Sequence, residues 1–167
     1  MADRRELVRG GSLNEVSLQV IGLVRSGRDS TDDRGWGSIE SVIEVLPRFA
    51  GGLEGLDGFS HALIVFYMHL DPDQEQATLR RRPRGRADMP MLGVFAQRGR
   101  MRPNPIGITA VAIARVEPGG LTVRGLDAVN GTPVLDIKPY FPIFDRVEGA
   151  RTPEWVDRLM VGYFGEE

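Results

Sequence analysis

Glycine and proline interrupt this chain too often for long helices to form. The chain holds 21 glycines and 11 prolines among its 167 residues, well above their usual combined share of about 12%. Both residues are unfavourable inside helices, whereas the turns between strands require them. Hydrophobic residues still make up 41% of the chain, which is enough to form a core. The sequence therefore predicts a mainly β fold with many turns.

Short apolar segments rich in β-branched residues lie between these turn residues. Several of them alternate with the period of two that half-buried strands show. Near the C-terminus, Thr152 can cap a helix, and Pro153 suits its first position. The side chains that follow fall on one face at helical spacing: Trp155, Val156, Leu159, Met160 and Tyr163. About seven strands and one C-terminal helix predict a small β-barrel rather than alternating βαβ units. The expected strands are 16–24, 38–46, 59–70, 91–96, 108–117, 121–128 and 132–140.

Several classes of protein are excluded by residues that the sequence lacks. It has no cysteine and two histidines, so disulfides, thiolate catalysis, zinc–thiolate sites and three-histidine metal sites are ruled out, and we expect no metal. The longest apolar run, Ala62–Met68, is far shorter than the roughly 20 residues of a membrane-spanning helix. No Gly-x-Gly-x-x-Gly follows a strand, so we expect no Rossmann nucleotide site.

The sequence predicts a single domain after a short tail. Residues 1–15 show no periodicity, and we expect them to form a loose N-terminal tail, with residues 16–167 as a single domain. The N-terminus is charged where an export signal would be apolar. We therefore expect a cytoplasmic protein that does not enter the membrane.

Positive charge is concentrated in one part of the chain. The net charge is −2, yet residues 80–102 carry eight arginines against one acid, Asp88, and so contribute +7. A strongly basic segment in a nearly neutral protein is typical of a surface that binds a polyanion. The alternative is a solvated loop, since residues 71–90 read as a long polar connector. The arginines of this connector are Arg80, Arg81, Arg82, Arg84 and Arg86.

Two segments have unusual chemistry for a scaffold. In the first, Arg98–Gly107, two prolines bracket Asn104 and fix the backbone on both sides of it. In the second, Gly125–Pro142, Asp136 and Lys138 are two residues apart on an expected strand, so they share a face and can form an ion pair. The alternative for each segment is a turn stiffened by proline. Ser60 and His61 are adjacent on another expected strand, so their side chains should point apart and form no nucleophile–base pair.

These segments carry a resemblance to a known family. GVFAQRGRMRPNPIGIT, LDAVNGTPVLDIKPYFP, SHALIVFYMH and IGLVRS resemble the TsaA/TrmO-like proteins, in unbroken order over residues 20–142. The resemblance implies a small β-barrel that binds S-adenosylmethionine and assembles as a homodimer. Characterised members methylate the exocyclic nitrogen of threonylcarbamoyladenosine beside the anticodon of certain tRNAs.

The resemblance also implies a cofactor site. The matching positions are Arg34, Gly35, Trp36, His69, Leu70, Arg98, Ile108, Asn130, Gly131, Thr132 and Pro133. The sequence departs from the family pattern at three places. Asp33-Arg34-Gly35 replaces Pro-Arg-Gln, Arg98-Gly99-Arg100 replaces Arg-Ser-Pro, and Asn130 replaces an aspartate.

The implied reaction requires few special groups. A sulfonium methyl donor needs no metal, so the protein must mainly align donor and acceptor. The acceptor nitrogen must lose a proton, for which Asn104, Asp127 and Asp136 are the candidate catalytic residues. The connector arginines would bind tRNA phosphates and present the anticodon loop. Two alternatives stay open: a regulatory or interaction protein that binds the cofactor without methyl transfer, and a methyltransferase that acts on a small molecule.

Overall fold

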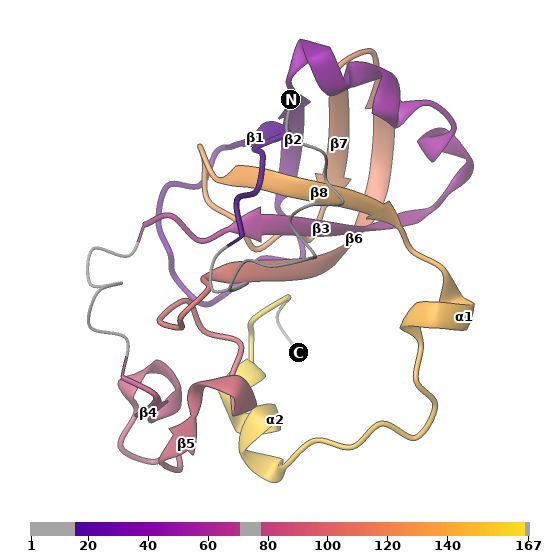
Figure 1. Cartoon of the computed structure of the whole chain (residues 1–167). Helices are drawn as coiled ribbons and strands as arrows, with labels where there is room; N and C mark the ends of the chain where they lie inside the picture. The colour runs from indigo at the N-terminus through magenta and orange to yellow at the C-terminus, as the bar shows by residue number, and fades with distance from the viewer. Residues whose placement is uncertain (1–15, 71–77, 166–167) are drawn as a thin grey trace, which may run out of the picture.

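The protein folds around a closed antiparallel β-barrel (Figure 1). The computed structural model describes residues 16–70 and 78–165. Within these residues, six strands close the barrel in the order β1-β2-β7-β6-β3-β8. They are β1 (Gly22–Ser26), β2 (Glu40–Val45), β3 (His61–Tyr67), β6 (Ile106–Glu117), β7 (Gly120–Arg124) and β8 (Pro133–Pro139). The expected mainly β barrel is confirmed, with six strands in the barrel rather than seven.

The barrel closes because β1 pairs with strands on both sides. Leu23 lies opposite Glu44 of β2 and opposite Pro133 of β8. Two register shifts, between Val65 and Phe66 and between Ile113 and Arg115, bend the longer ladders. Such bulges increase local twist and help a small sheet to curl into a barrel.

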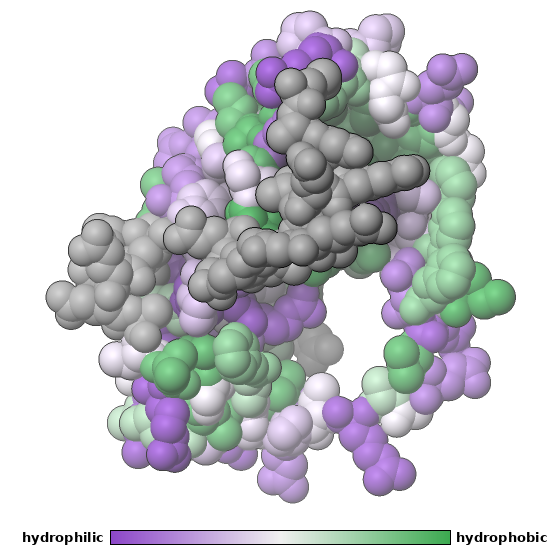
Figure 2. All heavy atoms as spheres, viewed as in Figure 1, coloured by the Kyte–Doolittle hydropathy of each residue, from purple (hydrophilic) through white to green (hydrophobic). Residues whose placement is uncertain are grey.

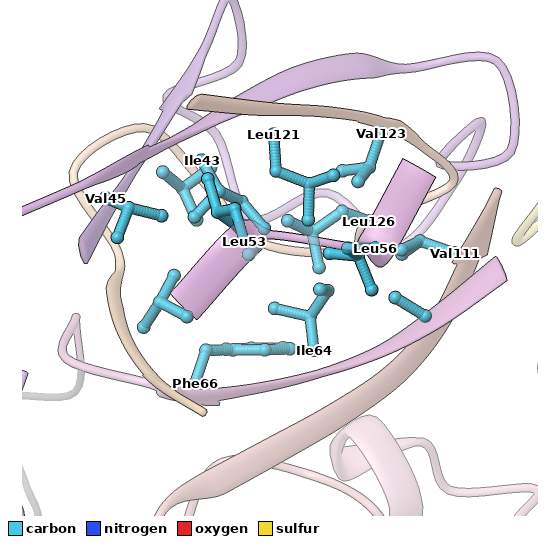
Figure 3. Packing of buried hydrophobic residues seen from close by; sticks show 14 residues of the cluster. Ile43, Val45, Leu53, Leu56, Ile64, Phe66, Val111, Leu121, Val123 and Leu126 are labelled. Carbon is cyan, nitrogen blue, oxygen red and sulfur yellow. The ribbon is translucent and has the colours of Figure 1, made fainter. Parts of the chain in front are cut away.

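The core fills the interior of the barrel (Figure 3). Burial along β2 alternates strictly, as the period-two pattern of the sequence predicts. Ile43, Ile64 and Leu121 are fully buried. Two short 3-10 helices, η1 (Pro47–Leu53) and η2 (Leu56–Gly58), contribute Leu53 and Leu56 to the same cluster.

Two expectations at the ends of elements are wrong. The first strand begins at Gly22 rather than at residue 16, and residues 16–20 are exposed and outside the barrel. The C-terminal helix α2 (Glu154–Met160) has Pro153 rather than Thr152 at its N-cap, and no side chain caps it. Pro153 has extended backbone angles, φ −63° and ψ 148°, so the helix begins one residue later than expected.

Residues 78–90 are more ordered than the expected connector, and the strand expected at 91–96 is reduced to two residues outside the barrel. Residues 78–96 form a small antiparallel sheet of β4 (Arg80–Arg81) and β5 (Leu92–Gly93), with 3-10 turns η4 (Pro83–Gly85) and η5 (Val94–Ala96). The rest of the connector, residues 71–77, lies outside the described residues, as does the expected tail of residues 1–15. Figure 1 shows this sheet beside α2, away from the barrel.

A further expectation, on Ser60 and His61, is also wrong. The Ser60 hydroxyl lies 2.9 Å from Nδ1 of His61. β3 begins at His61, so Ser60 precedes the strand and the alternation of side chains does not apply to it. This exposed pair lies at the end of the barrel where β3 begins, opposite to the end where β3 finishes and the predicted cofactor-binding residues lie.

The last part of the chain runs away from the barrel and returns. After β8 comes the short helix α1 (Pro142–Asp145), and residues 146–153 then lead to α2. The start of this arm, residues 140–153, contacts the barrel, since the Tyr140 N–H donates to the His61 carbonyl at 3.0 Å and Phe141 stacks on Phe59. Figures 1 and 2 show open space between the rest of the arm and the barrel. No helix in the described ranges 16–70 and 78–165 has the length and apolar character needed to cross a membrane.

Candidate functional site

The predicted cofactor-binding residues gather at one end of the barrel. At this end β1, β3 and β7 finish and β2, β6 and β8 begin, because neighbouring strands are antiparallel. The connections that meet here are residues 27–39, 68–105 and 125–132. Every predicted cofactor-binding residue lies in one of these connections or within three residues of one. Segments far apart in the sequence are thus brought to one face.

A single arginine organises the first connection. The Arg28 guanidinium donates hydrogen bonds to the carbonyl oxygens of Ser30 (3.3 Å), Asp32 and Arg34 (2.7 Å). Its central carbon also lies 3.9 Å from the ring centroid of Trp36, which is only 4% exposed. The planar guanidinium can bind several acceptors and stack on an aromatic ring at once. Arg28 therefore fixes the loop 28–36, which we call the cofactor loop because it contains three of the predicted cofactor-binding residues, Arg34, Gly35 and Trp36.

The turn 130–133 lies against this loop. The Asn130 backbone N–H donates to the Arg28 carbonyl at 2.8 Å, and the Ser26 N–H donates to the Asn130 side-chain oxygen at 3.3 Å. An aspartate would accept the same hydrogen bond, so the departure at Asn130 keeps the local geometry. Gly131 has φ +78°, a left-handed conformation that favours glycine. Thr132 is buried.

A second group lies where β3 ends and β6 begins. Arg98 donates to the Ile108 carbonyl at 2.5 Å, and the Ile108 side chain is 47% exposed. Leu70 is similarly exposed, at 46%. Beside it, Nδ1 of His69 is buried and has no hydrogen-bond partner among the described residues. Half-exposed apolar side chains next to an unsatisfied polar atom are typical of a surface that a ligand covers.

The three catalytic candidates lie in different environments. Asn104 is exposed on the connection 68–105. Asp136 lies within β8, where its carboxylate forms the expected ion pair with Lys138 at 2.6 Å and accepts the Ile137 N–H. Asp127 lies at the site end of the barrel and is partly buried. Of the three candidates, Asp127 is the one that lies at the site end and whose side chain accepts hydrogen bonds from residues distant in sequence.

Those partners are Thr109 and Tyr163. The Thr109 hydroxyl donates to Oδ1 of Asp127, and the Tyr163 hydroxyl donates to Oδ2 at 2.6 Å. Burial, followed by the nearby Asp127 carboxylate, raises the pKa of Tyr163 far above its ordinary value of about 10. Tyr163 thus keeps its proton and remains a donor.

The connector arginines have different surroundings. Arg80 is exposed, whereas Arg82 donates to the Met89 carbonyl. Arg81 is half-buried, and its Nη1 has no partner among the described residues. Arg86 forms an exposed ion pair with Asp88 at 2.7 Å, which raises the pKa of Arg86 and lowers that of Asp88.

Arg84 is tied to other parts of the protein. It forms an ion pair with Asp33 at 2.8 Å and donates to the Leu159 carbonyl at 2.7 Å. Its central carbon lies 5.5 Å from the Tyr163 ring centroid. These contacts join the connector to the cofactor loop and to the C-terminal segment.

Sequence reasoning missed Arg28, Thr109 and Tyr163. Arg28 and Thr109 carry no sequence signal, because their roles depend on contacts formed only in the folded chain. Tyr163 was expected on the apolar face of the C-terminal helix, yet it lies beyond α2 and directs its hydroxyl to Asp127. In the described part of the chain, no three His, Asp or Glu side chains are grouped so as to hold a metal ion.

Comparison with known proteins identifies the family. Residues 31–146 match the family described as the tRNA-methyltransferase O N-terminal domain. The chain belongs to this family. The TsaA/TrmO-like resemblance of the sequence is therefore confirmed, and the match contains all the predicted cofactor-binding residues.

Curated relatives of the tRNA-methyltransferase O family have names that refer to the cofactor or to tRNA. The chain is 38% identical over 136 residues to a "Probable S-adenosyl-L-methionine-binding protein" of Methanothermobacter thermautotrophicus, covering 78% of this chain and 94% of that protein. It is 38% identical over 101 residues to a human "tRNA (adenine(37)-N6)-methyltransferase", covering 60% of this chain and 22% of that protein. The first of these names contains S-adenosylmethionine, which is the cofactor expected from the sequence.

Solved structures of tRNA-methyltransferase O proteins share the fold. One, titled "Crystal structure of TrmO", has a TM-score of 0.68 and 37% sequence identity, covering 83% of this chain and 63% of that chain. Another, from Pseudomonas aeruginosa, has a TM-score of 0.65 and 34% identity, covering 82% and 61%. The chain thus spans less than two thirds of either solved protein.

Proposed function

We propose that this protein transfers a methyl group from S-adenosylmethionine to the exocyclic nitrogen of threonylcarbamoyladenosine beside the tRNA anticodon. The observation that carries the proposal is the gathering of the predicted cofactor residues at one end of a tRNA-methyltransferase O barrel. Relatives named for S-adenosylmethionine binding and for tRNA adenine methylation support it.

The described residues at this end fit the cofactor. S-adenosylmethionine combines an apolar adenine with a charged amino-acid part, so its site needs both apolar surface and hydrogen-bonding groups. Ile108 and Leu70 expose apolar surface, and Nδ1 of His69 is a buried polar atom in need of a partner. The cofactor loop and the turn 130–133 add backbone groups held in fixed positions.

The chemistry asked of the protein is alignment and proton removal. When bound, the cofactor supplies a methyl group on a good leaving group. The acceptor nitrogen must lose a proton, and a carboxylate can accept it. We propose Asp127 as the first candidate for this role, because Thr109 and Tyr163 hold its two oxygens in fixed directions. Asn104 remains a candidate at the rim, whereas the Asp136 carboxylate already pairs with Lys138.

We propose that four connector arginines bind the tRNA backbone, whereas the fifth, Arg84, is held by Asp33 and the Leu159 carbonyl. The four are Arg80, Arg81, Arg82 and Arg86. Beside them, a surface depression of about 560 Å³ is lined by Arg82 and Arg158, the acids Asp88 and Glu154, and the partly exposed ring of Trp155. Arginines next to an aromatic ring are typical of sites that hold phosphates and stack unpaired bases. Each phosphate contact should make log affinity fall by about 0.7 to 0.9 per unit of log salt. Replacing Arg80, Arg81 and Arg82 with Gln should flatten that slope by roughly two.

We propose that the protein is a homodimer. The arm 140–153 exposes Ile143 (87%), Phe144 (77%) and Val147 (71%), and these apolar side chains face solvent on a segment that stands away from the barrel (Figure 2). A four-residue helix is not stable alone, so α1 needs another surface to pack against. A second copy of the chain can supply that surface in a symmetric dimer. Light scattering at micromolar concentration should give twice the 18.4 kDa chain mass, and a mass near 18.4 kDa would contradict the dimer.

The functional proposal is tested by mass spectrometry of tRNA nucleosides from cells with and without the gene. We expect the methylated form of threonylcarbamoyladenosine to disappear without the gene and to return when the gene is restored. Cofactor binding with no change in any RNA nucleoside would favour the regulatory protein. Methyl transfer to a small molecule only would favour the alternative of a methyltransferase that acts on a small molecule.

We further propose that the protein is located in the cytoplasm, where tRNA is abundant. We also propose that residues 16–167 form one domain.

A further inference from the structure

We propose that the C-terminal segment Gly162–Phe164 is a wall of the cofactor site in this protein. It holds the cofactor loop and Asp127 in the arrangement that binds S-adenosylmethionine. The inference rests on the proposed cofactor but adds a segment that lies outside the matched family region, residues 31–146.

The first support is direct pairing of backbones. The Gly35 N–H donates to the Gly162 carbonyl at 2.9 Å, and the Trp36 N–H donates to the Tyr163 carbonyl at 2.8 Å. Both donors belong to residues that the family resemblance places in the cofactor site. The contact is so close that a Cβ atom on Gly37 would lie 1.8 Å from the Phe164 carbonyl oxygen. Only glycine permits this approach.

The second support is the side chain of Tyr163. Its hydroxyl reaches Asp127 at 2.6 Å from a position 36 residues away in sequence. Its ring packs edge-on against Phe164, with 4.9 Å between centroids. Since Thr109 holds the other oxygen of Asp127, the carboxylate is fixed between β6 and the C-terminal segment.

The third support is Arg84, which fastens the segment from the connector side. Its ion pair with Asp33 and its hydrogen bond to the Leu159 carbonyl join the cofactor loop to the end of α2. Arg84 has φ +52°, and no other non-glycine residue in the described ranges has a positive φ. That conformation costs about 1–2 kcal/mol and persists where surrounding contacts enforce it. Arg84 is therefore a positioning residue for the cofactor loop.

The closing experiment measures S-adenosylmethionine affinity by titration calorimetry. Gly37→Ala should push the segment off the loop and weaken affinity at least tenfold. Gly58→Ala is the matched control, because a Cβ atom there meets nothing within 4 Å, and its affinity should equal that of the wild type. If the wild type does not bind, the proposed function fails. If it binds and Gly37→Ala binds equally well, the wall is refuted while the proposed function stands.

A second pair of variants keeps the test valid if Gly37→Ala does not fold. Arg84→Gln should weaken cofactor affinity several-fold, whereas Arg115→Gln, which removes an exposed ion pair with Glu117, should leave it unchanged. In the methylation assay, Arg84→Gln should raise KM for the cofactor and leave KM for tRNA within twofold. A general loss of stability would lower the active fraction and hence kcat alone. A fall in kcat with KM for the cofactor unchanged would overturn the inference.

Discussion

Replacing Arg28 should weaken cofactor binding because one side chain holds the cofactor loop together. Its guanidinium bonds three carbonyl oxygens, those of Ser30, Asp32 and Arg34, and stacks on Trp36. Hydrogen bonds to charged groups each contribute about 1.5–3 kcal/mol, and cation–π stacking about 0.5–2 kcal/mol. In the Arg28→Ala variant, water replaces some of these hydrogen bonds. We therefore expect the free energy that stabilises the ordered loop to fall by roughly 3 kcal/mol.

The assay is calorimetric titration of Arg28→Ala with S-adenosylmethionine. If half of the loss, about 1.5 kcal/mol, appears in the free energy of binding, affinity falls roughly tenfold. Arg28→Lys should behave more like alanine than like the wild type, since an ammonium cannot stack or bond three carbonyls in a plane. The control is Arg25→Ala, which removes an exposed pair with Glu44 at 2.7 Å that contributes at most about 1 kcal/mol to stability. Wild-type affinity in Arg28→Ala would show that Arg28 does not hold the cofactor loop for binding.

Three further predictions concern stability. Gly107→Ala would place a Cβ atom 2.4 Å from the buried ring of Phe66, so it should cost about 1–3 kcal/mol in urea unfolding; an unchanged midpoint would argue against this packing. Ile64→Ala empties the centre of the core and should cost about 2–5 kcal/mol by the same measurement, with a loss below 1 kcal/mol as the contrary result. Burial raises the pKa of Tyr163, so the folded state keeps a proton that the unfolded state releases near pH 10. The free energy of unfolding should therefore be retained below about pH 10 and fall above it, more steeply in the wild type than in Tyr163→Phe, and equal slopes would speak against a buried phenol.

Much of the barrel could be predicted because its pattern is local. The alternation in Glu40–Val45 directly reflects one face packed in the core, and the Asp136–Lys138 pair follows from strand spacing alone. The error at Thr152 is also local: the proline beside it stays extended and takes the cap position itself. Local rules therefore predict the strands well and their ends less well.

The contacts that build the site could not be predicted in the same way. Tyr163 meets Asp127, and Arg84 meets Asp33, only because the chain returns to the barrel after α2. Nothing near these residues in sequence indicates their partners. Gly37 carries the one available signal, since a glycine directly after a buried tryptophan is consistent with a close backbone approach. Which backbone approaches it becomes known only from the fold.

An assay of methyl transfer by the purified protein shows whether this chain methylates threonylcarbamoyladenosine in tRNA. The protein is incubated with S-adenosylmethionine labelled in its methyl group and with two tRNA preparations, one carrying threonylcarbamoyladenosine and one lacking it, and the nucleosides are then analysed by mass spectrometry. We expect label in methylated threonylcarbamoyladenosine from the first tRNA, none from the second, and a lower rate with Gly37→Ala. Label in neither tRNA, from protein that binds the cofactor, would contradict the proposed function.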